Sequence, residues 1–169
     1  MRGLLIGRFQ PFHLGHLKVL EHVRAAHPKE TIVLGIGSSE ESYTPENPFT
    51  AGERAEMIER AMGSAGLTNW SAVPIPDIDR HPLWVAHVRE IVPPFERVYT
   101  NNPLTKLLFE REHLELEATP LFDRSALQGT HVRAALREGK PWKAFVPPDV
   151  AHYLESIDAP ARVRLLGPE

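Results

Sequence analysis

The start of the chain constrains the fold most, because an apolar strand pattern runs into a helical pattern across a turn that contains glycine. Residues 3–6 are mostly apolar, and residues 14–26 place apolar side chains on one helical face. The turn between them, residues 7–16, reads GRFQPFHLGH. Domains of the α/β class use this order of strand, turn and helix to hold a phosphate at the helix amino terminus. We therefore expect an α/β fold with an anion site at this turn.

Strand and helix patterns alternate along the rest of the chain. Strands are expected at 31–36, 72–75, 97–100 and 114–119, and helices at 51–65, 82–92, 103–109, 131–138 and 150–157. Residues 31–36 are apolar throughout, as a parallel strand covered on both faces requires, and Pro74 indicates an edge strand. The pattern predicts one doubly wound, Rossmann-like parallel-sheet domain over residues 1–169, ending in a tail at 158–169 to which no structure is assigned.

Composition and charge exclude several classes of function. The chain has 169 residues, a formal net charge of −3 and no cysteine. This charge argues against a broad surface for DNA or RNA, and the lack of cysteine excludes disulfides and thiolate metal sites. Apolar runs are shorter than the roughly 18 residues of a membrane helix, and the run after Met1 is too short for a signal peptide. We expect a cytoplasmic protein with no nucleic-acid or membrane partner.

Two histidines in the first turn are candidate ligands for an anion. His13 and His16 are three residues apart on the first helical turn, so both imidazoles can reach one ligand. Gly15 lies between them, and its missing side chain would let a flat group such as a nucleobase approach the backbone. Zinc binding is the alternative role for the two histidines, but a zinc ion needs a third or fourth protein ligand that the sequence does not offer. We therefore expect an anion site and no metal ligands.

A second stretch, residues 124–133 (RSALQGTHVR), also suits a phosphate. Gly129 and Thr130 at an expected helix start offer backbone N–H groups and a hydroxyl. Arg133 follows Thr130 by three residues on the same helical face, and its guanidinium can add charged N–H donors. In the alternative interpretation, Thr130 only caps the helix and Arg133 is only solvated.

A third stretch, residues 77–84 (DIDRHPLW), places a tryptophan on the first turn of a helix. Ligands of doubly wound sheets bind beside the loops after the strands, and this stretch begins in such a loop. The indole face of Trp84 attracts a cationic ring such as pyridinium. A tryptophan on an amphipathic helix is also a common core residue, so both roles stay open here.

These three stretches resemble motifs of one family. Residues 7–16 resemble the HxGH motif of the nucleotidyltransferase superfamily, and GRFQPFH resembles the archaeal-type nicotinamide-nucleotide (NMN) adenylyltransferases. Residues 124–133 resemble the family's R-x-x-I-S-G-T-x-V-R motif, which closes over the ATP phosphates, with Leu127 and Gln128 in place of Ile and Ser. Residues 77–84 resemble D-I-x-x-N-x-x-W, whose Trp stacks on nicotinamide, with His81 in place of Asn. The resemblance runs from residue 2 to about residue 142.

The resemblance implies transfer of AMP from ATP to NMN, which gives NAD⁺ and pyrophosphate. Under it, the expected catalytic residues are Arg8, His13, His16 and Arg133. The expected ATP-binding residues are Gly7, Arg8, Phe9, His13, Gly15, His16, Arg124, Gly129, Thr130 and Arg133. The expected NMN-binding residues are Ser38, Asp77, Ile78, His81, Trp84 and Asn101.

The resemblance also implies Mg²⁺ carried with ATP as the cofactor, and a homo-oligomer, often a hexamer. Two alternatives remain. One is a related transferase that acts on phosphopantetheine, FMN or a polyol phosphate, and the other is a nucleotide sensor without activity. Trp84 with Asp77 and Ile78 argues against the first alternative, and the joint presence of the phosphate-binding residues argues against the second.

Overall fold

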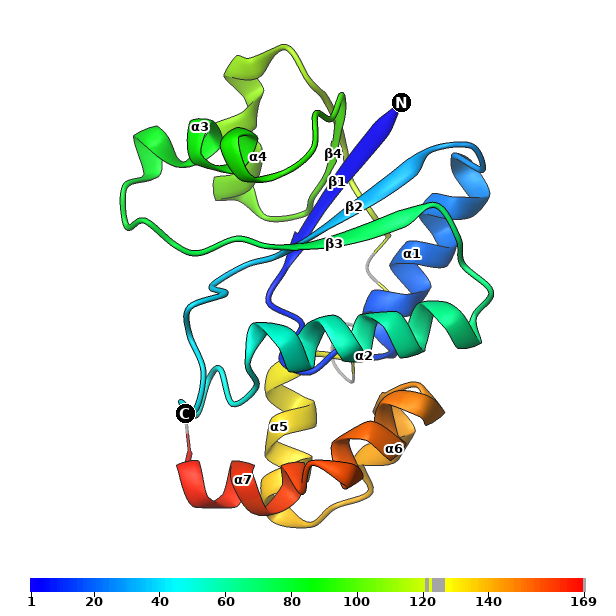
Figure 1. Ribbon diagram of the computed structural model, residues 1–169, viewed down its shortest axis with the longest axis vertical. Helices are drawn as coiled ribbons and strands as arrows, with labels where there is room; N and C mark the ends of the chain where they lie inside the picture. The colour runs from blue at the N-terminus through cyan, green and yellow to red at the C-terminus, as the bar shows by residue number, and fades with distance from the viewer. Residues whose placement is uncertain (121, 123–126, 169) are drawn as a thin grey trace.

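The computed structural model describes residues 1–120, 122 and 127–168, and across them five parallel strands form one sheet (Figure 1). The strands are β1 (Arg2–Gly7), β2 (Thr31–Ile36), β3 (Trp70–Pro74), β4 (Arg97–Tyr99) and β5 (Glu115–Glu117). Their order is β3-β2-β1-β4-β5, so the chain reverses its direction of travel across the sheet beside β1. In such sheets ligands bind at the carboxyl ends of the strands near this reversal. The expected doubly wound parallel sheet is confirmed.

Helices cover both faces of the sheet in the described part of the chain (Figure 1). They are α1 (Leu14–Ala26), α2 (Ala51–Ser64), α3 (His81–Ile91), α4 (Pro103–Phe109), α5 (Gly129–Glu138), α6 (Pro148–Ser156) and α7 (Ala159–Leu166), with short 3₁₀ turns at Glu110–Glu112 and Trp142–Phe145. One buried cluster joins β2 to α1, α2 and the carboxyl-terminal helices, and a second joins β1, β2 and β4 to α3 and α4. No helix among the described residues is long and apolar enough to span a bilayer.

The carboxyl-terminal third differs most from the sequence pattern. Helix α5 begins at Gly129 with Gln128 as its N-cap, whereas the expected helix began at residue 131. Helix α6 begins at Pro148, before the expected start at residue 150, because proline suits a first helical turn. The tail forms helix α7, whose Val163 is buried against the other helices. This helix is short, and its stability comes from that packing rather than from a local signal.

Candidate active site

A cavity of about 160 Å³ opens between the turn after β1 and the start of α5. Its lining is Arg8, Phe9, Gln10, His13, His16, Gly129, Thr130 and Arg133. The two stretches that supply these residues are far apart in the sequence. All but Gln10 are among the expected ATP-binding residues. Of the other three, Gly7 and Gly15 shape the turn, whereas Arg124 lies outside the described residues.

The two histidines form a stacked pair at the start of α1. Their ring centroids are 3.6 Å apart at an interplanar angle of 21°. The backbone N–H of His13 donates to Nδ1 of His16 at 3.2 Å. In a neutral imidazole this leaves the proton on Nε2, so His16 is oriented as a hydrogen-bond donor through that atom.

Burial keeps both histidines neutral at physiological pH. Desolvation, followed by the positive charge of Arg133, lowers the pKa of His13 to about 4. Desolvation, followed by the His13 imidazole, lowers the pKa of His16 well below its ordinary value. Two neutral rings can stack without the repulsion that two imidazolium ions would suffer. The site without a ligand therefore offers neutral donors rather than a pair of cations.

Gly7, Phe9 and Gly15 shape the turn that carries these histidines. Gly7 ends β1, and a Cβ there would lie 3.0 Å from the Phe9 ring. Phe9 is buried with a positive φ of 51°, and its ring packs edge-on against the His16 ring at 4.8 Å. A Cβ on Gly15 would lie 3.0 Å from Nδ1 of His13 and 3.1 Å from the Leu127 carbonyl oxygen. Gly15 thus makes room for the His13 ring, where the sequence suggested room for a nucleobase.

Arg133 is buried, with 2% of its surface exposed. Its Nη1 donates to the Gln10 carbonyl at 2.6 Å, and its Nη2 donates to Oγ1 of Thr130 at 3.3 Å. A Cβ on Gly129 would lie 2.9 Å from Nη1 of Arg133 and 3.1 Å from the Gln10 carbonyl oxygen, so glycine is what allows α5 to approach the first turn. The interpretation of Arg133 as a solvated residue and Thr130 as only a cap is therefore wrong.

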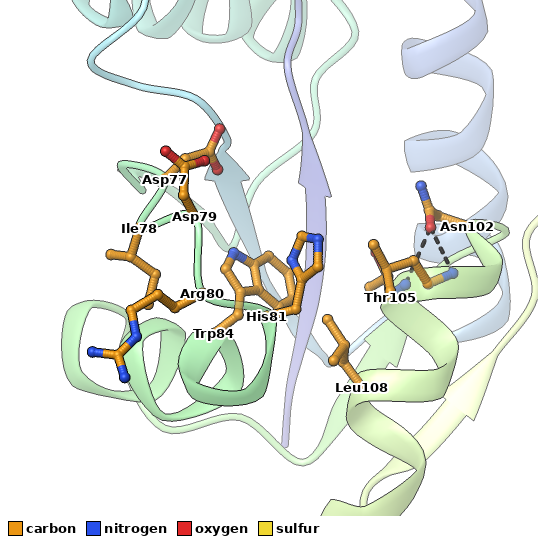
Figure 2. Close-up of a pocket in the computed structure, with 10 residues that line it drawn as sticks. Asp77, Ile78, Asp79, Arg80, His81, Trp84, Asn102, Thr105 and Leu108 are labelled. Atoms are coloured by element: carbon orange, nitrogen blue, oxygen red, sulfur yellow. Dashed lines mark hydrogen bonds between the residues drawn. The ribbon is translucent and has the colours of Figure 1, made fainter.

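A second cavity of about 230 Å³ lies between the loop before α3 and helix α4 (Figure 2). Its lining is Asp77, Ile78, Asp79, Arg80, His81, Trp84, Asn102, Leu104, Thr105 and Leu108. In Figure 2, the side chains of His81 and Trp84 are drawn between the acidic residues Asp77 and Asp79 on one side and helix α4 on the other. Trp84 also packs edge-on against Phe109 at 5.7 Å, so it is both a core residue and a cavity residue.

Two expected NMN-binding residues are not in this lining. The hydroxyl of Ser38 donates to Oδ2 of Asp77 at 2.7 Å, so Ser38 contacts a lining residue instead. Nδ2 of Asn101 donates to the Thr119 carbonyl at 2.7 Å. The neighbouring Asn102 lines the cavity and caps α4, since its Oδ1 accepts from the backbone N–H of Leu104 at 2.9 Å.

Sequence reasoning missed two residues that hold the site loops. Gln10 is buried, and its side chain both donates to the Phe49 carbonyl at 2.8 Å and accepts from the Phe49 N–H at 3.0 Å. Glu40 accepts the backbone N–H of Asp77 on both carboxylate oxygens at 3.0 Å. The sequence offered one sign for Gln10, which is a polar residue among apolar neighbours. Glu40 has no comparable signal.

No three His, Asp or Glu side chains gather in the described part of the chain in a way that could hold a metal ion.

Comparison with known proteins places this chain in a family. The cytidylyltransferase-like family model matches residues 4–135. A nicotinamide-nucleotide adenylyltransferase of Picrophilus torridus is 45% identical over 167 residues, covering 99% of this chain and 98% of that protein. The protein of the same name from Halorubrum lacusprofundi is 43% identical, covering 99% and 93%.

A solved structure agrees in fold. It is a bifunctional NMN adenylyltransferase/ADP ribose pyrophosphatase of Francisella tularensis, in complex with AMP and a manganese ion. The TM-score is 0.81 at 21% identity, over 98% of this chain and 51% of that one, so the chain spans about half of that protein. The family match and the full-length relatives lead to one conclusion: the chain belongs to the cytidylyltransferase-like family of nucleotidyltransferases.

Proposed function

We propose that the protein transfers AMP from ATP to NMN, giving NAD⁺ and pyrophosphate, a step of NAD biosynthesis. The observation that carries the proposal is the pairing of two different cavities at the carboxyl edge of one sheet. One is rich in donors for phosphate oxygens, and the other presents an indole ring. Relatives that carry this activity in their names match nearly the full chain.

The first cavity suits the ATP phosphates. The nucleophile of the reaction is the phosphate of the mononucleotide, which is already an anion at neutral pH, so no general base is needed. The reaction needs alignment and donors for the charge that develops on the α-phosphate and on the departing pyrophosphate. Nε2–H of His16, the guanidinium groups of Arg8 and Arg133, and the N–H groups at the start of α5 would supply them. We treat Mg²⁺ as part of the ATP substrate.

The second cavity suits the mononucleotide. Its pyridinium ring is positively charged, and the face of Trp84 would attract it. Asp77 and Asp79 add negative charge to the lining of the same cavity (Figure 2). Asp77 is held in place by the Ser38 hydroxyl and by Glu40.

A screen for pyrophosphate release tests the proposal. ATP and Mg²⁺ are combined with NMN, nicotinate mononucleotide, FMN, phosphopantetheine or glycerol phosphate, and the dinucleotide product is identified by chromatography. We expect release with NMN and formation of NAD⁺. Release only with FMN, phosphopantetheine or glycerol phosphate would identify a related transferase. Binding of ATP with no release from any acceptor would identify a nucleotide sensor. The His16→Ala protein provides the background rate.

We further propose a cytoplasmic location and a homo-oligomer, a hexamer as is common in the family that the sequence resembles. Size-exclusion chromatography with light scattering tests the oligomer.

A further inference from the structure

Helix α2 carries an arginine that is completely buried. Arg54 is 0% exposed and shares the inner face of the helix with Ile58 and Ala61. Another arginine of the same helix, Arg60, is exposed and pairs with Glu56 one turn away. A charge without water is costly unless other groups hydrogen-bond to it, so the contacts of Arg54 have to offset a large desolvation cost.

The partners of Arg54 are all backbone carbonyls. Nη1 donates to the carbonyl of Arg8 at 3.0 Å and to that of Gly37 at 2.8 Å. Nη2 donates to the carbonyl of Ser38 at 3.1 Å and to that of Glu41 at 3.4 Å. Nε donates to the carbonyl of Thr50 at 3.2 Å. One guanidinium thus joins the turn after β1, the loop after β2 and the start of α2.

The carbonyls that Arg54 holds belong to both halves of the site. Arg8 lines the phosphate cavity, whereas the hydroxyl of Ser38 binds Asp77 of the second cavity. Ser38 also has a positive φ of 46°, a strained backbone conformation that needs support from its surroundings. The guanidinium therefore lies between the backbone segments that carry the two cavities.

We propose that Arg54 is a positioning residue, which sets the distance and orientation between the two half-sites through the carbonyls of Arg8, Gly37 and Ser38. The inference rests on the proposed transfer between two ligands, which requires the reacting atoms to be aligned at about 3–3.5 Å. Arg54 lines neither cavity, so it acts through the backbone and not by contact with a substrate.

The start of α2 is held independently of Arg54. The hydroxyl of Thr50 accepts from the Glu53 N–H at 3.2 Å, and the Glu53 carboxylate accepts from the Thr50 N–H at 2.9 Å. The same carboxylate binds both Nη atoms of Arg162 from α7, at 2.7 and 2.8 Å. Loss of the Arg54 side chain should therefore leave the helix in place and release mainly the two loops.

The test compares Arg54→Lys with the wild type at a temperature well below both unfolding midpoints. A lysine keeps the charge, but its single nitrogen cannot bridge carbonyls on both sides. We expect kcat to fall about 10- to 100-fold, because a misplacement of about 1 Å can cost that much. The Kd of ATP alone and that of NMN alone, from calorimetry, should each change less than about threefold, since each half-site stays intact. Faster hydrogen exchange at residues 37–41 should accompany the loss.

Arg60→Lys is the matched control, because it changes an exposed arginine on the same helix and should leave kcat unchanged. Arg54→Met, which removes both the charge and the donors, is the second variant. A lower unfolding midpoint with normal kcat would reduce Arg54 to a structural residue and overturn the proposal, as would failure of both variants to fold. A wild type that binds both ligands without forming NAD⁺ would instead overturn the proposed function, and the positioning role with it.

Discussion

The two cavities differ in how firmly their lining is held. In the phosphate cavity, His13, Gln10 and Arg133 are buried and bonded to the protein or stacked on a neighbour. In the second cavity, Asp79 and His81 are exposed, and Trp84 is only partly buried. These three side chains of the first lining are in place before a ligand arrives, although Arg8 of the same lining is exposed. The exposed side chains of the second lining can still change rotamer.

This difference suggests that the two cavities contribute differently to catalysis and to substrate binding. Donors that are already oriented need no reorganisation during the reaction, and such donors favour the transition state over the ground state. Exposed side chains contribute less, because water screens their charges. Substitutions in the phosphate cavity should therefore affect mainly kcat, folding and ATP binding, and substitutions in the second cavity should affect mainly the binding and the choice of mononucleotide.

The largest effect is expected from His16→Ala. The variant removes an oriented Nε2–H donor, so kcat should fall on the order of 10²- to 10³-fold, as for one lost transition-state donor. Steady-state formation of NAD⁺ measures it, with circular dichroism to verify folding. His22→Ala, which changes an exposed histidine on the same helix, should retain wild-type kcat. Near-normal turnover in a folded His16→Ala protein would remove this histidine from the mechanism.

The next effect concerns stability at acid pH. Burial lowers the pKa of His13 to about 4, so the unfolded chain takes up a proton at higher pH than the folded protein does. The contribution of the neutral His13 ring to the free energy of unfolding is fully present above about pH 6.5, the ordinary pKa of imidazole. This contribution is lost as the pH falls below that value. Between about pH 7 and pH 4.5, the wild type should lose about 2 kcal/mol more unfolding free energy than His13→Asn does.

Urea unfolding of both proteins across this pH range measures that difference. His81→Asn serves as the control from the second cavity, because its imidazole is exposed in the folded protein, and it should follow the wild type. Parallel curves for the wild type and His13→Asn would contradict the view that the phosphate cavity holds a buried neutral histidine.

A pair of substitutions then tests the division between the half-sites. Arg133→Ala should weaken ATP binding far more than NMN binding. Trp84→Ala should weaken NMN binding by about 1–2 kcal/mol, the value of a desolvated cation–π contact, and should change ATP binding little. Calorimetry of each ligand on each folded variant provides the four affinities. Equal losses of both ligands in both variants would mean that the half-sites are misassigned.

The smallest effect is expected at His81. A protonated imidazole beside the pyridine substituent would favour the carboxylate of nicotinate mononucleotide over the carboxamide of NMN. The preference should fall by up to about 1 kcal/mol in His81→Asn, because the substitution removes a ring that can carry positive charge in an exposed pair. The ratio of kcat/KM for the two mononucleotides measures it, in the wild type and in His81→Asn. A ratio that the substitution does not change would leave His81 without a role in specificity.

The sequence by itself determined the features whose signals are local. The run of residues 7–16 between a strand and a helix predicted a site at that turn, where the structure has a cavity, since residues that are close in the chain form the turn. That this cavity binds phosphate stays a prediction. Alternating strand and helix patterns predicted the parallel α/β class, because periodicity reports which face of each element is buried. The resemblance to the family's D-I-x-x-N-x-x-W motif grouped Asp77, Ile78, His81 and Trp84, and the structure places them at one cavity. Their roles in binding stay predictions.

Only the tertiary structure decided which distant segments meet. Local patterns gave no sign that Asn102 rather than Asn101 would line the cavity, or that the tail would form α7. Arg54 offered a weak sign, as a charge on the apolar face of its helix, but its partners lie in loops that the sequence does not position. Side-chain periodicity records burial within one element, whereas a hydrogen bond between loops depends on where the packed sheet and helices bring their backbones together.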